Sequence, residues 1–360
     1  MNFLFRQLNP HSCLTYLVGN PETKEIVLVD PVLDHVPNYL KLLETEKLRL
    51  VAVIDTHTHA DHISGGAALL DHVHAQYVMH KNAAASCPTT RVTDNARLTL
   101  AGIEFTFIEA PGHTRDSICV ILPGKILTGD ALFLDDGGAG RDDLPGGDAG
   151  AHWDSFQKIL ALPDVLMVYP AHEYRHRQPS TLAQQKKSNP HLQHKTREEY
   201  IRYFQELKLG PADWMKDVLK ANYACARDPK AAWIPVDVPA CEVKGTMAHG
   251  ANDVKVEEIS PEELSKKINS KESILLLDVR DPEELKGELG VLPNVVNIPV
   301  AALSHHLKDI EAKKNEPVIT ICKAGGRAHT AAQILIQSGF KNVRKLSGGM
   351  TAMHNLAGQK

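Results

Sequence analysis

The sequence predicts an α/β protein with two domains of unequal size. Its 360 residues exceed the length at which a single hydrophobic core usually stops growing, about 250–300 residues. Strand-like segments and helical patterns alternate in two separate series, and residues 228–256 between them hold three prolines and little periodicity. We therefore expect a domain at residues 1–245 and a second at 246–360.

Short strands dominate the expected first domain. Segments rich in β-branched or aromatic residues, bounded by turn-forming residues, predict strands at 13–19, 25–30, 49–55, 76–80, 104–110, 118–124, 125–130 and 165–170. Apolar residues three and four positions apart predict helices at 36–44, 64–73, 153–162, 196–208 and 212–222. A loop rich in Gly and Asp, residues 135–150, is too polar to pack alone.

A second α/β series begins near residue 255. Ser260 is expected to cap a helix, because Pro261 follows it and Glu263 stands three residues after it. Apolar strands are expected at 273–280 and 317–322, and a further helix ends at Gln337.

Composition argues against several classes of function. Forty Lys and Arg residues stand against 44 Asp and Glu, a formal net charge of −4, so we expect no nucleic-acid or anionic-membrane partner. No apolar run approaches the about 18 residues of a membrane span. The N-terminus lacks a basic region followed by a long apolar segment, which favours a cytoplasmic location. We expect small-molecule partners, and the sequence is compatible with a homodimer.

The six cysteines are scattered and form no Cys-x-x-Cys pair. They are Cys13, Cys87, Cys119, Cys225, Cys241 and Cys322. In a chain of this length we interpret them as reduced thiols, most of them buried, and not as a disulfide framework or a zinc finger.

A histidine-rich stretch, "THTHADH", follows the predicted strand 49–55. His57 and His59 are two positions apart and share a face of an extended segment, so their side chains can converge. The turn after them can bring Asp61 and His62 into the same pocket.

Three further candidates also follow predicted strands: His113 in "PGHT", Asp130 in "LTGD" and His172 in "PAHEY". Several strand ends that deliver His or Asp to one edge of a sheet predict a metal site.

This ordered set resembles the metallo-β-lactamase superfamily over roughly residues 1–240. The resemblance implies an αββα sandwich with the metal at one edge of its sheets. It does not fix the reaction, because members include dinuclear hydrolases, flavoprotein oxygen reductases and mononuclear iron oxygenases.

The order of "PGHTRDS", "ILTGDALF", "GRDD" and "PAHEY" is more similar to the persulfide dioxygenases than to the lactamases. Those enzymes bind one Fe(II) through two histidines and one aspartate, which correspond here to His57, His113 and Asp130. Such a set leaves positions open for O₂ and a thiolate substrate. The same resemblance assigns an orienting role, through hydrogen bonds to the ligands, to His59, Asp61, His62 and His172.

The resemblance also implies contacts to glutathione from Thr114, Arg141 and Tyr174. Arg141 lies on the polar loop, where a guanidinium suits a glutathione carboxylate.

Glyoxalase II, a thioester hydrolase, is the main alternative. Its motif also contains the "HEY" found at residues 172–174. Hydrolysis would use a metal-bound hydroxide, with zinc in place of iron. The sequence does not count metals, so both activities stay open.

The second series ends a strand at Cys322, in "TICKAGGRA". Backbone N–H groups and a helix N-terminus would point at the sulfur, with Lys323, Ala324, Gly325 and Gly326 forming the substrate-binding loop. Such a positive environment favours a thiolate that can carry sulfane sulfur covalently. We expect Cys322 and Arg327 to be the catalytic residues.

Residues 255–360 resemble the rhodanese (sulfurtransferase) domain, which implies a mostly parallel sheet. "LLLDVRDPEEL" matches that family's Asp-x-Arg strand, with Asp278 and Arg280 as structural residues. Six residues from Cys322 through Arg327 fit sulfur transfer, whereas phosphatase-like members use a longer loop. The usual His-Ile-Pro-Gly is absent, and non-catalytic relatives lack the cysteine that this chain retains.

The combination resembles the bacterial persulfide dioxygenase–rhodanese fusion proteins. It implies oxidation of glutathione persulfide by O₂ to sulfite and glutathione, with sulfur transfer between thiosulfate or sulfite and glutathione at Cys322. The first domain would make sulfite, which the second can consume, and the fusion raises the effective concentration of each domain near the other.

Overall fold

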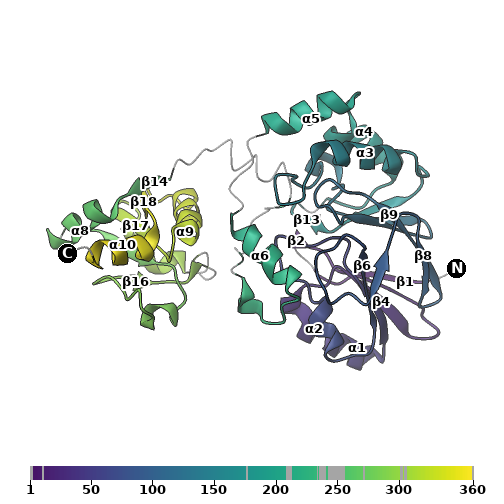
Figure 1. The fold of residues 1–360 in the computed structure, drawn as a ribbon, viewed down its shortest axis with the longest axis horizontal. Helices are drawn as coiled ribbons and strands as arrows, with labels where there is room; N and C mark the ends of the chain where they lie inside the picture. Colours follow the sequence, from purple (N-terminus) through teal and green to yellow (C-terminus); the bar gives the residue numbers. More distant parts are fainter. Residues whose placement is uncertain are drawn as a thin grey trace. The chain divides into compact units, whose positions relative to one another are not determined.

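The computed structural model describes residues 3–9, 12–175, 177–207, 213–232, 234, 241, 256–270, 272–300, 303 and 306–358. The chain forms two compact units, Met1–Ala251 and Asn252–Lys360 (Figure 1). The expected domain boundary between residues 245 and 246 lies outside the described residues.

The first unit contains two sheets. One has the order β1-β3-β4-β5-β6-β7 and the other the order β12-β11-β10-β9-β8. The first is made of β1 (Leu4–Gln7), β3 (Tyr16–Gly19), β4 (Glu25–Val29), β5 (Arg49–Ile54), β6 (Gln76–His80) and β7 (Thr90–Val92). The second is made of β8 (Arg97–Leu100), β9 (Ile103–Glu109), β10 (Ile118–Leu122), β11 (Lys125–Gly129) and β12 (Met167–Pro170).

Alternation along the strands makes the two sheets pack face to face. In β4, Val27 and Val29 join one apolar core with Phe105 and Phe107 of β9, while Ile26 of β4 points to the opposite side. Residues two apart in a strand share a face, so each sheet has one face toward the other sheet and one toward helices.

Helices cover both outer faces (Figure 1). They are α1 (Val36–Glu46), α2 (Gly66–Leu70) and α6 (Asp213–Tyr223) on the first sheet, and α3 (Ala149–Leu160), α4 (Leu182–Ser188) and α5 (Arg197–Glu206) on the second. The αββα sandwich expected from the sequence is therefore confirmed. A small third sheet pairs β2 (Ser12–Cys13) with β13 (His172–Glu173).

The second unit is built on one parallel sheet with the order β14-β18-β17-β15-β16. Every strand pair in it is parallel. The strands are β14 (Glu257–Ile259), β15 (Leu275–Asp278), β16 (Val296–Asn297), β17 (Pro317–Ile321) and β18 (Asn342–Leu346), and the helices are α8 (Pro261–Asn269), α9 (Gly326–Gln337) and α10 (Gly349–Gly358). The predicted cap is confirmed, because the Ser260 side chain accepts a hydrogen bond from the Glu263 amide.

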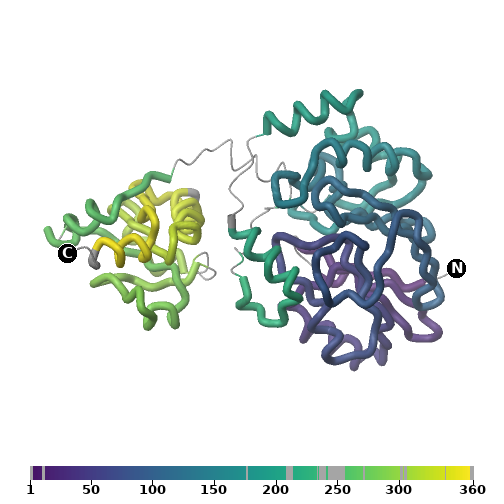
Figure 2. Tube along the Cα trace, viewed as in Figure 1, coloured from purple at the N-terminus to yellow at the C-terminus, as the bar shows by residue number. Residues whose placement is uncertain are grey.

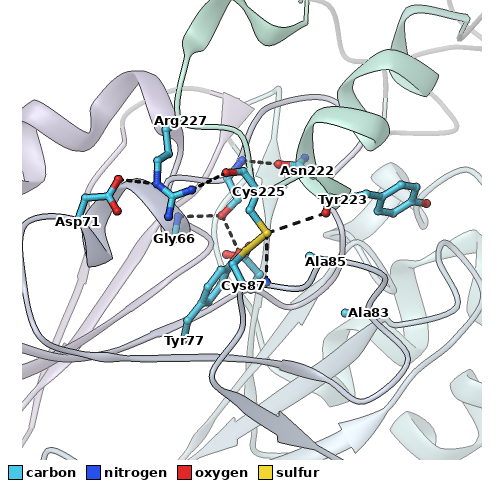
Figure 3. The surroundings of a disulfide bond; sticks show 12 residues. Gly66, Asp71, Tyr77, Ala83, Ala85, Cys87, Asn222, Tyr223, Cys225 and Arg227 are labelled. Carbon is cyan, nitrogen blue, oxygen red and sulfur yellow. Dashed lines mark hydrogen bonds and ion pairs between the residues drawn. A yellow bond between two sulfur atoms is a disulfide. The ribbon is translucent and has the colours of Figure 1, made fainter.

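One expectation about cysteines is wrong. Cys87 and Cys225 form a disulfide whose Cα atoms are 6.1 Å apart although the residues are 138 positions apart in sequence (Figure 3). The chain returns in α6 to lie beside α2 and the segment after β6, and only this tertiary contact brings the two thiols together (Figure 2). Cys13, Cys119, Cys241 and Cys322 are free thiols, as expected.

Among the described helices, none has both the length and the apolar character needed to cross a membrane.

Asp278 and Arg280 form a buried ion pair in the second unit. Arg280 donates to both carboxylate oxygens of Asp278 at 2.6–3.1 Å, and each side chain is 1% exposed. Asp278→Ala would leave a buried guanidinium without its anion, so we expect it to destabilise the second unit by about 3–5 kcal/mol. Hydrogen exchange of the β17 amides measures this loss.

The control is Glu283→Ala, which removes an exposed ion pair with Lys286 and should change stability by less than about 0.5 kcal/mol. A loss below about 1 kcal/mol for Asp278→Ala would contradict the structural role of the buried pair.

Candidate metal centre and sulfur-transfer loop

The histidine loop after β5 is fixed by hydrogen bonds from three separate parts of the first unit. Thr56 donates its amide and hydroxyl to Asp30 at 2.7–3.1 Å, and Thr58 donates both groups to Asp116 at 3.0 and 2.6 Å. Asn222 of α6 donates to the carbonyls of His59 and His62 at 2.7 and 2.9 Å. Backbone groups held in this way set the direction of the imidazoles before any ligand binds.

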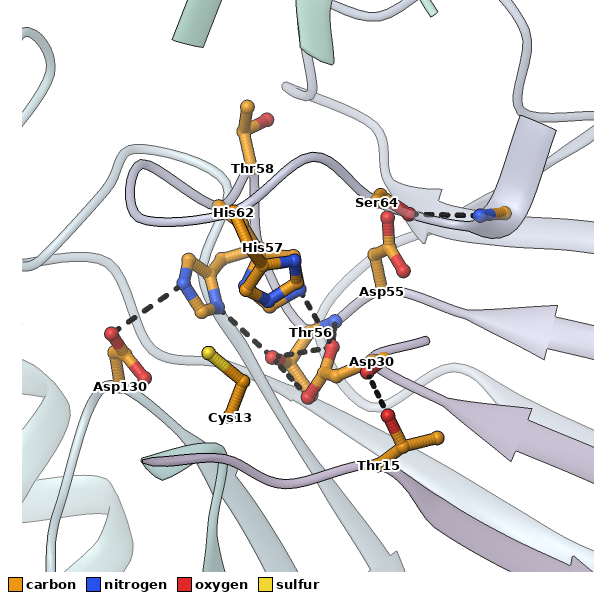
Figure 4. A network of polar contacts seen from close by, with 12 residues as sticks. Cys13, Thr15, Asp30, Asp55, Thr56, His57, Thr58, His62, Ser64 and Asp130 are labelled. Atoms are coloured by element: carbon orange, nitrogen blue, oxygen red, sulfur yellow. Dashed lines mark hydrogen bonds and ion pairs between the residues drawn. The ribbon is translucent and has the colours of Figure 1, made fainter. Parts of the chain in front are cut away.

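Two imidazoles and one carboxylate meet at the edge of the sheets. His57 Nε2 lies 3.7 Å from Asp130 Oδ2 (Figure 4). His113 Nε2 lies 3.5 Å from the same oxygen, and all three side chains are completely buried. The structure therefore brings together the three predicted metal ligands, with donor atoms within 4.8 Å of one another.

These donor atoms fit a metal ion. Among the described residues, His57 Nε2, His113 Nε2 and both Asp130 carboxylate oxygens have no hydrogen-bond partner. Buried polar atoms are normally paired, so an unpaired set that converges on one point indicates a bound cation.

The opposite ring nitrogens are held by the protein. His113 Nδ1 hydrogen-bonds the Arg141 carbonyl, and His57 Nδ1 hydrogen-bonds the Thr56 hydroxyl at 3.0 Å. A Nδ1–H that donates to a carbonyl leaves the Nε2 lone pair of His113 directed at the site. Burial, together with His59 and His113, holds the pKa of His57 well below its ordinary value, so this imidazole is neutral and can act as a ligand.

A second group of donors lies beside the first, and it contains the four residues predicted to orient the ligands. His172 Nε2 is 3.4 Å from both Asp61 Oδ2 and Asp130 Oδ1, and His62 Nδ1 hydrogen-bonds the Ile63 carbonyl. His59 Nε2 pairs with Asp30 at 3.2 Å. Burial favours the neutral form of His59, but Asp30 and Asp55 outweigh this effect and raise its pKa to about 10.

The three predicted glutathione contacts also lie near the ligands. Thr114 is adjacent to His113, and its hydroxyl is 2.7 Å from that of Ser117. The Tyr174 ring stacks on His172 with 5.6 Å between ring centroids. The Arg141 side chain is 1% exposed and makes two hydrogen bonds to Asp143 at 2.7 and 2.8 Å.

The loop after β17 surrounds the Cys322 sulfur. The Gly325 amide donates to Cys322 Sγ at 3.1 Å, and α9 begins at the next residue, so its N-terminus faces the sulfur. Gly325 has a φ of 106°, a backbone conformation that is unfavourable for residues with a side chain. The arrangement can stabilise a negative charge on sulfur.

Two further contacts define this loop. Lys323 and Ala324 are exposed, whereas Cys322 is 2% exposed. Arg327 is half-buried and forms a two-point ion pair with Glu284, at 2.5 and 2.7 Å. Its guanidinium is therefore held at the start of α9 by a carboxylate of the segment after β15.

Models of known protein families match each of the two units. The metallo-beta-lactamase superfamily model matches residues 8–172, and the rhodanese-like domain model matches residues 260–356. Human mitochondrial persulfide dioxygenase ETHE1 is 31% identical over 227 residues, which cover 62% of this chain and 88% of the human protein. The chain belongs to the ETHE1 persulfide dioxygenase family. It also carries a rhodanese-like domain.

One solved structure supports this assignment, and a second shares the fold. The crystal structure of ETHE1 from Myxococcus xanthus has a TM-score of 0.58 at 36% identity, and the match covers 62% of this chain and 99% of that one. A metallo-beta-lactamase from Staphylococcus aureus has a TM-score of 0.60 over 97% of this chain and 100% of its own. At 20% identity the second likeness shows the fold alone.

Several residues of the ETHE1-like site were missed by sequence reasoning. Asp30 follows β4 as Asp130 follows β11, so the strand-end pattern could have identified it. Asp116 and Asn222 carry no such signal. Cys13 donates to Asp61 at 3.3 Å and Cys241 lies with Asp130 and His172, and only the fold brings these thiols to the site.

Asp130→Asn keeps the size of the side chain and removes its charge. Because Asp130 lies between both predicted histidine ligands, we expect at least about a tenfold loss of metal affinity. Competition with a chelator of known affinity, followed by elemental analysis, measures the loss.

His74→Ala is the matched control, since His74 is exposed and lies outside this site. Wild-type metal affinity in Asp130→Asn, with its fold intact by circular dichroism, would contradict the assignment of Asp130 as a ligand.

Proposed function

We propose that the chain is a bifunctional sulfur-metabolism enzyme. Its first unit would oxidise glutathione persulfide with O₂ to sulfite and glutathione, and its second would transfer sulfur between thiosulfate or sulfite and glutathione. The observation that carries the proposal is that one chain contains both sites. The donor atoms of His57, His113 and Asp130 are buried without hydrogen-bond partners among the described residues, and the Cys322 sulfur accepts a hydrogen bond from the Gly325 amide. Small molecules are the partners that this activity requires, and we propose a cytoplasmic location.

Fe(II) is the proposed metal, one per chain. Two neutral imidazoles and one carboxylate form a set that suits Fe(II), which would supply open positions for O₂ and for a thiolate. The Arg141 carbonyl and the Thr56 hydroxyl keep the imidazoles of His113 and His57 directed at that point.

The substrate would be positioned by residues around the ligands. Thr114 stands next to His113, and Tyr174 presents a half-buried ring stacked on His172. The Arg141 guanidinium already pairs with Asp143, so it would bind a glutathione carboxylate and the Asp143 carboxylate at the same time. Burial of the whole ligand set would exclude bulk water from the reacting sulfur.

Sulfur transfer would proceed through a persulfide on Cys322. The thiolate attacks the outer sulfur of thiosulfate, a new S–S bond forms, and sulfite leaves with the electron pair of the broken bond. Glutathione thiolate then attacks the outer sulfur of this persulfide, so that glutathione persulfide forms and Cys322 leaves as a thiolate. The Gly325 amide would stabilise the anionic sulfur, and exposed Lys323 would attract the anionic substrate.

A zinc thioester hydrolase of the glyoxalase II type is the second candidate. The observation that favours it is the second donor group, since donor atoms of His59, Asp61 and His172 also lie within 4.8 Å of one another. Two adjacent metals would suit hydrolysis by a bound hydroxide. His59 is compatible with such a site, because Asp30 holds its Nε2 while its Nδ1 has no hydrogen-bond partner among the described residues.

Two variants test whether the two activities are separate. Cys322→Ser should abolish transfer from thiosulfate to glutathione and leave O₂ consumption with preformed glutathione persulfide within about twofold of wild type, since the serine lacks a nucleophilic sulfur. His113→Ala should lose O₂ consumption by at least about a hundredfold and keep sulfur transfer. An oxygen electrode and a sulfite assay measure both.

Loss of both activities in either folded variant would contradict two independent sites. Retained O₂ consumption in His113→Ala would contradict the proposed ligand set. Thioester hydrolysis without O₂ consumption in the wild type would replace the proposal with the second candidate.

A further inference from the structure

The Cys87–Cys225 disulfide contains no residue of the proposed chemistry. Cys225 is, however, three positions from Asn222, which hydrogen-bonds the metal loop at residues 57–64. Cys225 follows the end of α6, and Cys87 follows β6 (Figure 3). Asn222, in the last turn of α6, holds the carbonyls of His59 and His62 and accepts a hydrogen bond from the Ser64 amide at 2.9 Å. The covalent bond therefore anchors the turn that carries Asn222.

The backbone ends α6 in the left-handed conformation at Cys225. Its φ is 55°, and the Ala226 amide donates to the Ala221 carbonyl at 3.0 Å, which together form a helix C-terminus that normally has glycine at this position. The left-handed conformation is less favourable than the right-handed one for a residue that has a side chain. Lys47 ends α1 in the same conformation, so such a turn accepts a side chain, and at Cys225 that side chain forms the disulfide.

Noncovalent contacts also hold this turn. Val218 and Leu219 of α6 are buried, so apolar packing secures the middle of the helix. Beyond Asn222, Ala226 packs against the apolar core and Arg227 donates to the Cys225 carbonyl at 3.1 Å. Arg227 also pairs with Asp71, and both of these side chains are about half exposed. Exposed pairs contribute little, so the disulfide adds a covalent restraint to the hydrogen bonds of Asn222 and the apolar packing of Ala221.

The two sulfurs differ in a way that sets the direction of exchange. Cys87 is partly exposed, whereas Cys225 is buried at the edge of an apolar core. The Cys87 amide donates to Cys225 Sγ at 3.2 Å, and this N–H would stabilise a thiolate that leaves from Cys225. An attacking thiol would therefore bond to Cys87.

We propose that Cys87–Cys225 is an exchange site for small thiols of the glutathione class, and that its reduction loosens the hold of Asn222 on the metal loop. A thiolate attacks Cys87 Sγ, a mixed disulfide forms, the Cys87–Cys225 bond breaks, and Cys225 takes its electron pair and a proton. A second thiol attacks the mixed disulfide, so that two small thiols become one disulfide and both cysteines become thiols. The exchange does not depend on the proposed oxidation of persulfide, and it holds for iron or zinc in the site.

The first test is reduction of the folded full-length chain by millimolar glutathione. Acid quenching, alkylation and mass spectrometry should find glutathione on Cys87 at early times and two new thiols, Cys87 and Cys225, at late times. Resistance of the native disulfide to glutathione, or two free thiols in the protein purified under air, would overturn the proposal. Glutathione on Cys225 instead would overturn the assigned point of attack.

The second test is hydrogen exchange of the loop at residues 57–64, before and after reduction by glutathione or by a phosphine. We expect roughly tenfold faster exchange after reduction, as the loss of about one net hydrogen bond would give. Residues 103–109 of β9 serve as the internal reference and should not change. Reduction without faster exchange in the loop would overturn the link to Asn222.

Two variants separate this link from general loosening. Asn222→Ala should exchange rapidly in the loop while still oxidised, and reduction should add less than about twofold, because both changes remove the same restraint. Asp71→Ala removes the exposed partner of Arg227 and should behave as wild type. A full additional tenfold increase on reduction of Asn222→Ala would overturn the assigned route.

Discussion

Burial of two imidazoles and a carboxylate, with their donor atoms unpaired and directed at one point, is the constraint on which the first unit depends. Desolvation favours the neutral forms, since burial raises the pKa of Asp130 and lowers that of His57. A cation at the meeting point would offset this cost. The surrounding structure keeps the donors in place, through Asp30 and Asp116 on the loop backbone.

In the second unit the corresponding constraint applies to one buried atom, the Cys322 sulfur. Cys322 is buried at the end of β17, and an anionic sulfur there needs donors, which the Gly325 amide and the start of α9 provide. Arg327 adds a positive charge but is held by Glu284, so its field is partly neutralised before substrate arrives. The loop therefore depends on backbone amides more than on a free guanidinium.

Local patterns predicted the strands and the residues at their ends. The segments rich in β-branched residues at 49–55 and 118–124 correspond to β5 and β10, and the predicted ligands that follow strands lie together. Helix 64–73 is shorter in the structure, at Gly66–Leu70, where Gly66 packs against the Tyr77 ring. Local sequence does not report such close packing between segments.

Residues that act over long sequence separations could not be predicted. Asn222 reaches His59 across 163 positions, and the disulfide spans 138. Each of these contacts depends on tertiary structure, so a pattern within one segment contains no sign of it.

The central claim is that the donors of the first unit hold iron for sulfur oxidation. Elemental analysis of the purified full-length chain, combined with O₂ uptake on glutathione persulfide, tests it most directly. The account predicts one iron per chain and equal amounts of O₂ consumed and sulfite formed. Two zinc ions per chain, with thioester cleavage and no O₂ uptake, would contradict it.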